Sequence, residues 1–222
     1  MVNHIAVILD GNRRYAKKHN LSLYKGHEKG AENVEKLMDW ARELGVKELT
    51  LYSFSMQNFN RTKSEFNYLM SLFEIFFKKA LARLRKTHEN VRFNFIGRLV
   101  KFPSKIQKLA NDLMIKTKKN KELVVNFAFG YGGREEIIDA VKRIVKKKLD
   151  VSEKSISDNL YLKSEPEIII RPGGEKRTSN FLIWQSTYSE WFFINKFWPE
   201  FTKNDLKRII CEYGKRERRY GV

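Results

Sequence analysis

The chain has 222 residues, of which 44 are Lys or Arg and 26 are Asp or Glu, so its formal net charge at pH 7 is +18. This length suits one domain, residues 1–222, with a sizeable core. The sequence has neither an apolar run of about 18 residues nor an N-terminal signal-peptide pattern, so we expect no transmembrane helix and a cytoplasmic location. Its one cysteine, Cys211, excludes an internal disulfide and is expected to pack as a core thiol.

Six predicted strands alternate with amphipathic helical patterns along the chain. The strands are expected at residues 4–9, 48–54, 91–96, 122–129, 167–170 and 190–194. The helices are expected at residues 28–44, 64–87, 104–118, 134–148, 178–187 and 203–218. This alternation predicts an α/β domain built around a mainly parallel sheet.

The positive charge is concentrated in residues 78–121, which hold 14 Lys or Arg but only two acidic residues. Such a segment is typical of nucleic-acid binding. However, its lysines alternate with apolar residues at helical spacing, as around Ile106 and Leu113, which favours the solvated face of an amphipathic helix. Attraction to anionic lipid headgroups is a third interpretation.

Polar or glycine residues follow four of the predicted strands. Asp10 follows the first strand, Ser55 the second, Gly130 the fourth and Arg171 the fifth. Ligands of open parallel sheets bind beyond the carboxyl ends of the strands. We therefore expect these four ends to converge on one crevice.

Two of these strand ends carry residues suited to phosphate. Asp10 precedes Arg13 and Arg14, a combination that suits a metal ion held against a phosphate, although Asp before Gly is also a common turn. Arg171 and Arg177 flank a Gly-Gly turn, where forked donors and close backbone approach suit an anion with many oxygens. A helix beginning near Ser179 would add free N–H groups.

Other site classes find no support in the sequence. Neither G-x-G-x-x-G nor G-x-x-x-x-G-K-[ST] occurs, so the glycine-rich segments do not indicate a nucleotide site. The four histidines and one cysteine make no zinc-ligand spacing. Without any Asp-Asp pair, the aspartate-rich motif of trans-type prenyl synthases is missing as well.

Five motifs, in order along the chain, resemble the signature blocks of the cis-prenyltransferases. The blocks are Asp10-Gly11-Asn12-Arg13-Arg14-Tyr15-Ala16, Leu51–Arg61, Asn126–Arg134, Arg171–Gln185 and the C-terminal series of Glu190, Trp198-Pro199 and Arg216–Gly221. The first looks more like archaeal and eukaryotic members than bacterial ones. The resemblance implies six strands surrounded by helices and addition of isopentenyl diphosphate to an allylic diphosphate such as farnesyl or geranylgeranyl diphosphate.

The resemblance also implies roles for individual residues. Asp10 would be catalytic and bind Mg²⁺, with Glu190 as a second metal ligand, and Asn58 would assist the condensation. The allylic diphosphate would contact Gly11, Asn12, Arg13 and Arg14, and isopentenyl diphosphate would contact Arg171, Arg177 and Ser179. Further substrate contacts would come from Tyr15, His27, Ser55, Phe59, Arg61 and Thr178.

Family likeness further implies a tunnel for a growing polyprenyl chain and a homodimer. The helix at 64–87 would form one tunnel wall, with one of Phe73, Phe76 and Phe77 facing away. A tail, Arg219–Gly221, would reach the partner's substrate, and the basic surface would allow peripheral membrane contact. Leu23 stands where bacterial members carry arginine, so that phosphate contact is missing or supplied by Lys25.

Two other functions stay open at this point. A non-catalytic partner subunit of the same family is disfavoured because such subunits tend to lose the D-G-N-x-R motif, which is intact. A nucleic-acid-binding protein would rest on net charge alone.

Overall fold

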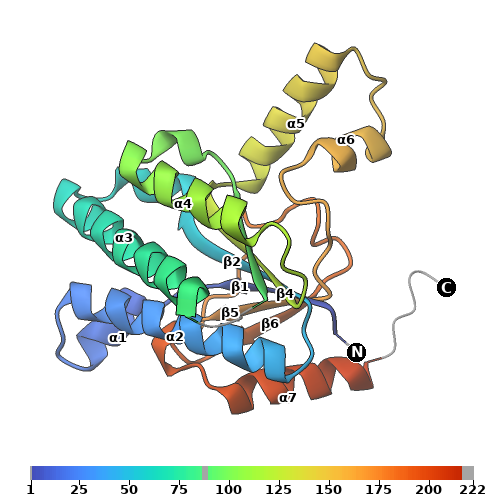
Figure 1. The fold of residues 1–222 in the computed structure, drawn as a ribbon. Coiled ribbons are helices and arrows are strands. Elements are labelled where there is room, and N and C mark those ends of the chain that lie inside the picture. The colour runs from blue at the N-terminus through green and yellow to red at the C-terminus, as the bar shows by residue number, and fades with distance from the viewer. Residues whose placement is uncertain (1, 87–89, 217–222) are drawn as a thin grey trace.

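The computed structural model describes residues 2–86 and 90–216, whose strands form one six-stranded sheet at the centre of the molecule (Figure 1). The strands are β1 (His4–Ile8), β2 (Glu48–Ser55), β3 (Val91–Ile96), β4 (Leu123–Tyr131), β5 (Ile168–Pro172) and β6 (Glu190–Ile194). Their order across the sheet is β3-β4-β2-β1-β5-β6, and every neighbouring pair is parallel. The predicted α/β class and all six strands are confirmed.

Helices surround this sheet. They are α1 (Asn12–Lys18), α2 (Leu23–Glu43), α3 (Lys63–Lys86), α4 (Ser104–Thr117), α5 (Gly133–Lys147), α6 (Glu153–Asn159) and α7 (Lys203–Lys215). Single 3-10 turns are η1 (Met56–Asn60), η2 (Leu99–Lys101) and η3 (Trp198–Glu200). The sequence analysis did not predict α1 and α6. It also placed the start of α2 at residue 28, whereas the helix begins at Leu23. The glycines at 26 and 30 have low helix propensity, so this first part of the helix was not expected.

The helix predicted at residues 178–187 is wrong. Turns and bends occupy this segment. Ser179, Asn180 and Leu182 have φ angles of 51°, 64° and 46°, in the left-handed region that a right-handed helix excludes. The free helical N–H groups expected near Ser179 are therefore not formed.

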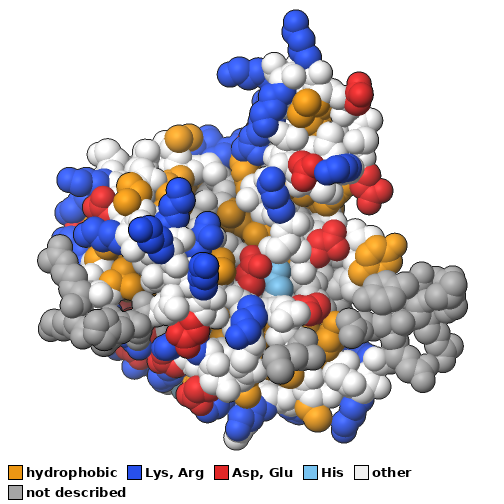
Figure 2. All heavy atoms as spheres, turned by 45° about the vertical axis from the view of Figure 1, so that its right-hand side comes forward, with side chains coloured by type: hydrophobic (Ala, Val, Ile, Leu, Met, Phe, Trp, Pro, Cys, Tyr) orange, Lys and Arg blue, Asp and Glu red, His pale blue; other side chains and the backbone are white. Residues whose placement is uncertain are grey.

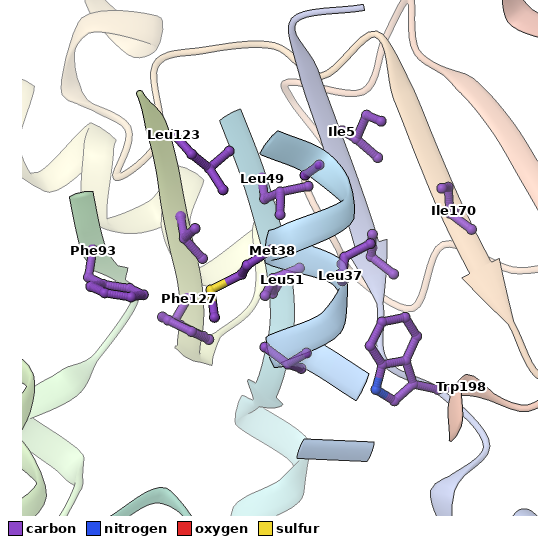
Figure 3. Close-up of a cluster of buried hydrophobic side chains, with 14 of the residues drawn as sticks. Ile5, Leu37, Met38, Leu49, Leu51, Phe93, Leu123, Phe127, Ile170 and Trp198 are labelled. Atoms are coloured by element: carbon purple, nitrogen blue, oxygen red, sulfur yellow. The ribbon is translucent and has the colours of Figure 1, made fainter. Parts of the chain in front are cut away.

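Alternate residues of each strand serve two cores, one on each face of the sheet. Ile5 and Val7 of β1 belong to the larger core, with side chains from α2, α3, α4 and α7. Figure 3 shows this core, where Leu37 and Met38 of α2 lie over the sheet. The smaller core, on the other face, includes Ala6 and is closed by residues from the 160–182 segment, namely Leu162, Phe181 and Leu182.

The basic segment forms the outer surface that its periodicity predicts. In α4, Ile106, Ala110 and Leu113 are buried, whereas Lys105 and Lys108 are exposed. Cys211 is exposed, so its predicted place in the core is wrong. Its neighbour Ile209 faces the core, and a residue two positions further along a helix points to the opposite side.

The α5 and α6 hairpin projects from the body of the molecule (Figure 1). Lys and Arg side chains cover much of its outer end in the space-filling view (Figure 2). Between them, Val145, Leu149 and Val151 are exposed. None of the helices in the described parts of the chain is both long and apolar enough to span a membrane.

Candidate active site

A cavity of about 660 Å³ opens beyond the carboxyl ends of β1, β2 and β5 and continues between α2 and α3. Three of the four predicted strand ends contribute to it, through Asp10, Ser55 and Arg171. Gly130 of β4 does not line it. The sheet order explains this difference, because β1 lies between β2 and β5 whereas β4 lies beyond β2.

Asp10 is held at this cavity by two arginines. Its carboxylate oxygens accept hydrogen bonds from Arg14 Nη2 at 3.0 Å and Arg171 Nη2 at 2.9 Å. Arg171 is only 4% exposed, and its second terminal nitrogen donates to the hydroxyl of Ser179 at 2.7 Å and to the carbonyl of Arg177. Asp10, the predicted metal ligand, and Arg171, a predicted diphosphate ligand, are thus joined by a direct hydrogen bond.

In the Gly173-Gly174 turn, Gly173 lies against the guanidinium of Arg14. Both glycines have positive φ angles, 102° and 76°. Arg14 Nη1 donates to the carbonyl of Gly173 at 2.7 Å, and a Cβ at Gly173 would lie 2.8 Å from Arg14 Nη2. Glu175 bridges Arg14, at 3.1 Å, and Arg177, at 2.6 Å. One carboxylate therefore neutralises Arg14 of α1 and Arg177 of the Arg171–Asn180 segment, and a substrate phosphate could replace it.

Asn12 is half-buried where α1 packs against α2. A Cβ at Gly30 would lie 2.4 Å from Asn12 Oδ1, and one at Gly26 would lie 2.3 Å from the carbonyl oxygen of Asn12. These two glycines allow the close crossing that places Asn12 at the cavity. Asn12 Oδ1 is buried and has no hydrogen-bond partner among the described residues. Asn12 and Asp10 line the same cavity.

His27 and Arg61 meet at Glu65, a residue that the sequence analysis missed. Glu65 Oε1 lies 2.9 Å from Arg61 Nη1 and 3.4 Å from His27 Nε2, and Glu65 is buried. Burial, together with the positive charge of Arg61, lowers the pKa of His27, so the imidazole is neutral at pH 7. Burial also lowers the pKa of Arg61. The four-residue spacing from Arg61 to Glu65 at the start of a helix is a signal that could have identified this contact.

The η1 loop carries the other predicted residues of this side. Asn58 Oδ1 accepts from the backbone N–H of Ser55 at 3.0 Å, and both residues line the cavity. Phe59 is not among the lining residues. Its ring packs instead against Phe54 and Phe102, with centroids 4.9 and 5.2 Å apart.

Several predicted substrate ligands also lie outside the cavity lining. They are Gly11, Arg13, Arg14, Tyr15 and Thr178. Gly11, with a φ of 105°, packs beneath the ring of Phe197, and Tyr15 packs on His19. Leu23 and Lys25 do not line the cavity, and Lys25 pairs with Glu28 at 2.6 Å.

Glu190 is separated from Asp10. It begins β6 and pairs with Arg216, whereas Asp10 contacts Arg171, which lies opposite Phe193. Glu190 and Phe193 are three positions apart along β6, a length of about 10 Å. The two predicted metal ligands do not meet within one chain.

Beyond its polar end the cavity is apolar. Leu69, Leu72, Phe73, Phe76 and Phe77 of α3 all line it. The expectation that one of the three phenylalanines faces away is therefore wrong. Phe76 additionally borders a second cavity of about 30 Å³ between α2 and α3, so its ring lies between two spaces.

Comparison with known proteins shows the family to which the chain belongs. Residues 8–221 match a family profile described as putative undecaprenyl diphosphate synthase. The chain belongs to this family of cis-prenyltransferases. It is 45% identical to the isoprenyl transferase of Thermotoga maritima, over 98% of this chain and 96% of that protein. It is 43% identical to the tritrans,polycis-undecaprenyl-diphosphate synthase (geranylgeranyl-diphosphate specific) of Pyrococcus abyssi, over 98% of this chain and 86% of that one.

Solved structures of the same family have the same fold as this cis-prenyltransferase. Lavandulyl diphosphate synthase from Lavandula x intermedia, in complex with dimethylallyl diphosphate, superposes with a TM-score of 0.94 at 32% identity, covering 100% of this chain and 98% of that one. A probable undecaprenyl diphosphate synthase from Campylobacter jejuni gives a TM-score of 0.86 at 36% identity, covering 100% and 99%. These relatives are named as enzymes, so the two alternative functions, a non-catalytic partner subunit and a nucleic-acid-binding protein, are not favoured for this chain.

Proposed function

We propose that this cis-prenyltransferase adds isopentenyl diphosphate units repeatedly to an allylic diphosphate, with Z double bonds, to make a long polyprenyl diphosphate that serves as a precursor of a glycosyl carrier lipid. One observation carries the proposal: a single cavity joins a polar end, with Asp10, Arg171 and Arg177, to an apolar end lined by Leu69, Phe73 and neighbouring residues of α3. A diphosphate headgroup with a hydrocarbon tail requires both ends in one space.

The polar end would bind two diphosphate groups, each through its own set of residues. Arg171, Arg177 and Ser179 hold that of isopentenyl diphosphate, and Gly11, Asn12, Arg13 and Arg14 hold the allylic one. The allylic carbon–oxygen bond breaks, the isopentenyl double bond attacks the allylic carbon, and a proton is lost as the new double bond forms. Free diphosphate leaves with the bonding electrons. Asn58 and Arg61 from the η1 side fix the orientation of the reacting groups.

The residues present fit a magnesium ion at this end. Magnesium prefers oxygen ligands and is commonly held by one or two carboxylates together with substrate phosphates. Asp10 and Asn12, two residues with side-chain oxygens, both line the cavity. Within residues 2–86 and 90–216 no group of three His, Cys, Asp or Glu side chains could hold a metal, so the diphosphate would complete the coordination. When bound, the ion would neutralise charge on the leaving diphosphate.

Glu190 would bind a second metal ion only after release from Arg216, which is its partner here, and with groups other than the described residues around Asp10. The tail Arg219–Gly221, expected to reach a partner's substrate, lies outside the described residues. A homodimer is supported by the edge position of β6, whose Trp191 and Phe193 rings stack 5.6 Å apart. It is also supported by Val145 and Val151 on the projecting hairpin, which are 68% and 72% exposed.

Either farnesyl or geranylgeranyl diphosphate would serve as the primer. The wide apolar end supports a prenyl chain longer than a single isoprene unit, and the Pyrococcus relative is named as specific for geranylgeranyl diphosphate. The enzyme would be cytoplasmic, and peripheral membrane contact would follow from its lipid product and from the lysine-rich outer face of α4.

Incubation with radiolabelled isopentenyl diphosphate, Mg²⁺ and a panel of primers tests the proposal. The panel contains dimethylallyl, farnesyl and geranylgeranyl diphosphate, and the products are separated by chromatography after removal of the phosphates. We expect long polyprenols of one main length. Products extended by no more than one unit with every primer would overturn the assignment of repeated addition.

A further inference from the structure

The turn that carries Ser179 has an unfavourable backbone conformation. Ser179 and Asn180, two consecutive non-glycine residues, both have positive φ angles, and Leu182 follows with a third. Such a conformation is sterically disfavoured for residues other than glycine and persists only where surrounding contacts enforce it. Ser179 Oγ nevertheless has a defined position, 2.7 Å from Arg171 Nη1. Some other part of the molecule must hold this turn.

The first turn of α5 makes those contacts, and all of them converge on Asn180. The N–H of Gly133 donates to the carbonyl of Asn180 at 2.7 Å, and the N–H of Arg134 donates to Asn180 Oδ1 at 2.9 Å. Asn180 Nδ2 donates to Glu135 Oε2 at 2.9 Å. We name this set of residues, Gly133, Arg134, Glu135 and Asn180, the Asn180 clamp.

Gly132 leaves the space that the clamp needs. A Cβ at Gly132 would lie 2.2 Å from Glu135 Oε2 and 2.7 Å from Asn180 Nδ2, at the centre of the side-chain hydrogen bond. The φ angle of Gly132 is −161°, which any residue adopts, so the constraint is one of space alone. The Tyr-Gly-Gly-Arg segment after β4 therefore has a use that does not involve phosphate, because two N–H groups at the start of α5 are already used by Asn180.

We propose that Asn180 is a positioning residue for isopentenyl diphosphate: the Asn180 clamp holds the turn so that Ser179 and the carbonyl of Arg177 keep Arg171 in its binding orientation. This inference rests on the proposed role of Arg171, Arg177 and Ser179. Asn180 itself lines the cavity, whereas Gly132 does not. The proposal therefore predicts that breaking the clamp from the α5 side, as in Gly132→Ala, weakens isopentenyl diphosphate binding without changing a residue that lines the cavity.

A swap of donor and acceptor tests the clamp. In Asn180→Asp two carboxylates face each other, whereas Asn180→Asp combined with Glu135→Gln restores the hydrogen bond in the reverse direction and still accepts from Arg134 N–H. We expect Asn180→Asp to raise the KM for isopentenyl diphosphate at least about tenfold with kcat within about threefold, and the double variant to return KM to within about threefold of wild type. Asn111→Asp, on the exposed side of α4, controls for the added charge.

Two further variants separate the possible failures. Gly132→Ala places a methyl group in the clamp and should raise the same KM. It keeps the test available if thermal unfolding measurements show that Asn180→Asp is not folded. An unchanged KM in folded Asn180→Asp or Gly132→Ala, or a double variant no better than Asn180→Asp, overturns the clamp. A wild-type KM in Ser179→Ala would instead overturn the proposed substrate contact on which the clamp depends.

Discussion

Arg171 and Asp10 form an ion pair in which the arginine is almost completely buried, with Arg171 Nη2 2.9 Å from Asp10 Oδ2. A buried guanidinium is costly unless its charge is compensated. Asp10 compensates it in the substrate-free site, and a diphosphate could compensate it in the loaded site. The same guanidinium of Arg171 therefore stabilises the fold before substrate binds and contacts the diphosphate afterwards.

Asp10→Asn is the first test of this arrangement. The amide cannot act as a charged metal ligand, so we expect kcat to fall by more than about a hundredfold. The amide oxygen still accepts one hydrogen bond, and the thermal unfolding temperature should fall less than in Asp10→Ala. A folded Asp10→Asn enzyme with near wild-type kcat would contradict the role of Asp10 in catalysis.

Arg177→Ala and Arg171→Ala should differ in a defined way. Arg177 has an exposed side chain paired with Glu175, so its loss should raise the KM for isopentenyl diphosphate with little change in stability. Loss of Arg171 should raise the same KM and also destabilise the protein, because Asp10 and Ser179 both lose a donor. Steady-state kinetics with thermal unfolding measures both effects, and substrate titrations like those of wild type in both variants would refute the phosphate site.

Gly30→Ala should displace Asn12 from the cavity. The added Cβ would lie 2.4 Å from Asn12 Oδ1, so the side chain of Asn12 must move. We expect the KM for the allylic diphosphate to rise about tenfold or more. Gly214→Ala is the matched control, since its Cβ meets no atom within 4 Å and alanine favours the helix. Equal kinetics for the two variants would argue against Asn12 as a ligand.

The lowered pKa of His27 predicts a dependence of stability on pH. The unfolded chain binds a proton at His27 below about pH 6.5, while the folded protein resists it, so the free energy of unfolding should fall as pH decreases from 6.5 towards the folded-state pKa. The slope from one such group is at most about 1.4 kcal/mol per pH unit. His27→Gln should flatten the profile. Parallel wild-type and His27→Gln profiles in urea unfolding would contradict this.

Phe76→Ala should lengthen the product. The ring lies between the main cavity and the small cavity bounded by α2 and α3, so its removal joins the two spaces. The volume gained accommodates about one more isoprene unit. Phe77→Ala opens space as well but removes a fully buried ring, at a cost of about 3–5 kcal/mol. Chromatography of the products, with Ile75→Ala on the exposed side of α3 as control, measures the shift. An unchanged length in folded Phe76→Ala would show that this ring does not limit the chain.

Local periodicity was sufficient to predict the sheet but not the packing around the site. The six strands are short apolar runs between helical patterns, and each lies within a few residues of its predicted place. The segment 178–187 has helical spacing, yet contacts from α5 hold Asn180 in a left-handed conformation that no local pattern reveals. Cys211 illustrates a different limit, because apolar neighbours do not determine which side of a helix is buried.

Contacts within the candidate site were easiest to predict where strand ends carry charge. Asp10 and Arg171 are examples, and the structure brings them together. Glu65 was missed because its role depends on contacts with Arg61 and His27, and the second of these lies on another helix. Glu190 shows the reverse case, since its family motif is intact while its position in the single chain is remote from Asp10.

The Asn180 clamp limits what can be transplanted from this protein. The ten residues from Arg171 to Asn180 contain the arginines, the glycine turn and the hydroxyl groups, and as a peptide they would look like a complete anion-binding loop. Their shape, however, is imposed by Gly133, Arg134 and Glu135, which lie about 40 residues earlier in the chain. A designer who grafts only the loop onto another scaffold would transfer its charge without its geometry; the start of α5 has to be grafted with it.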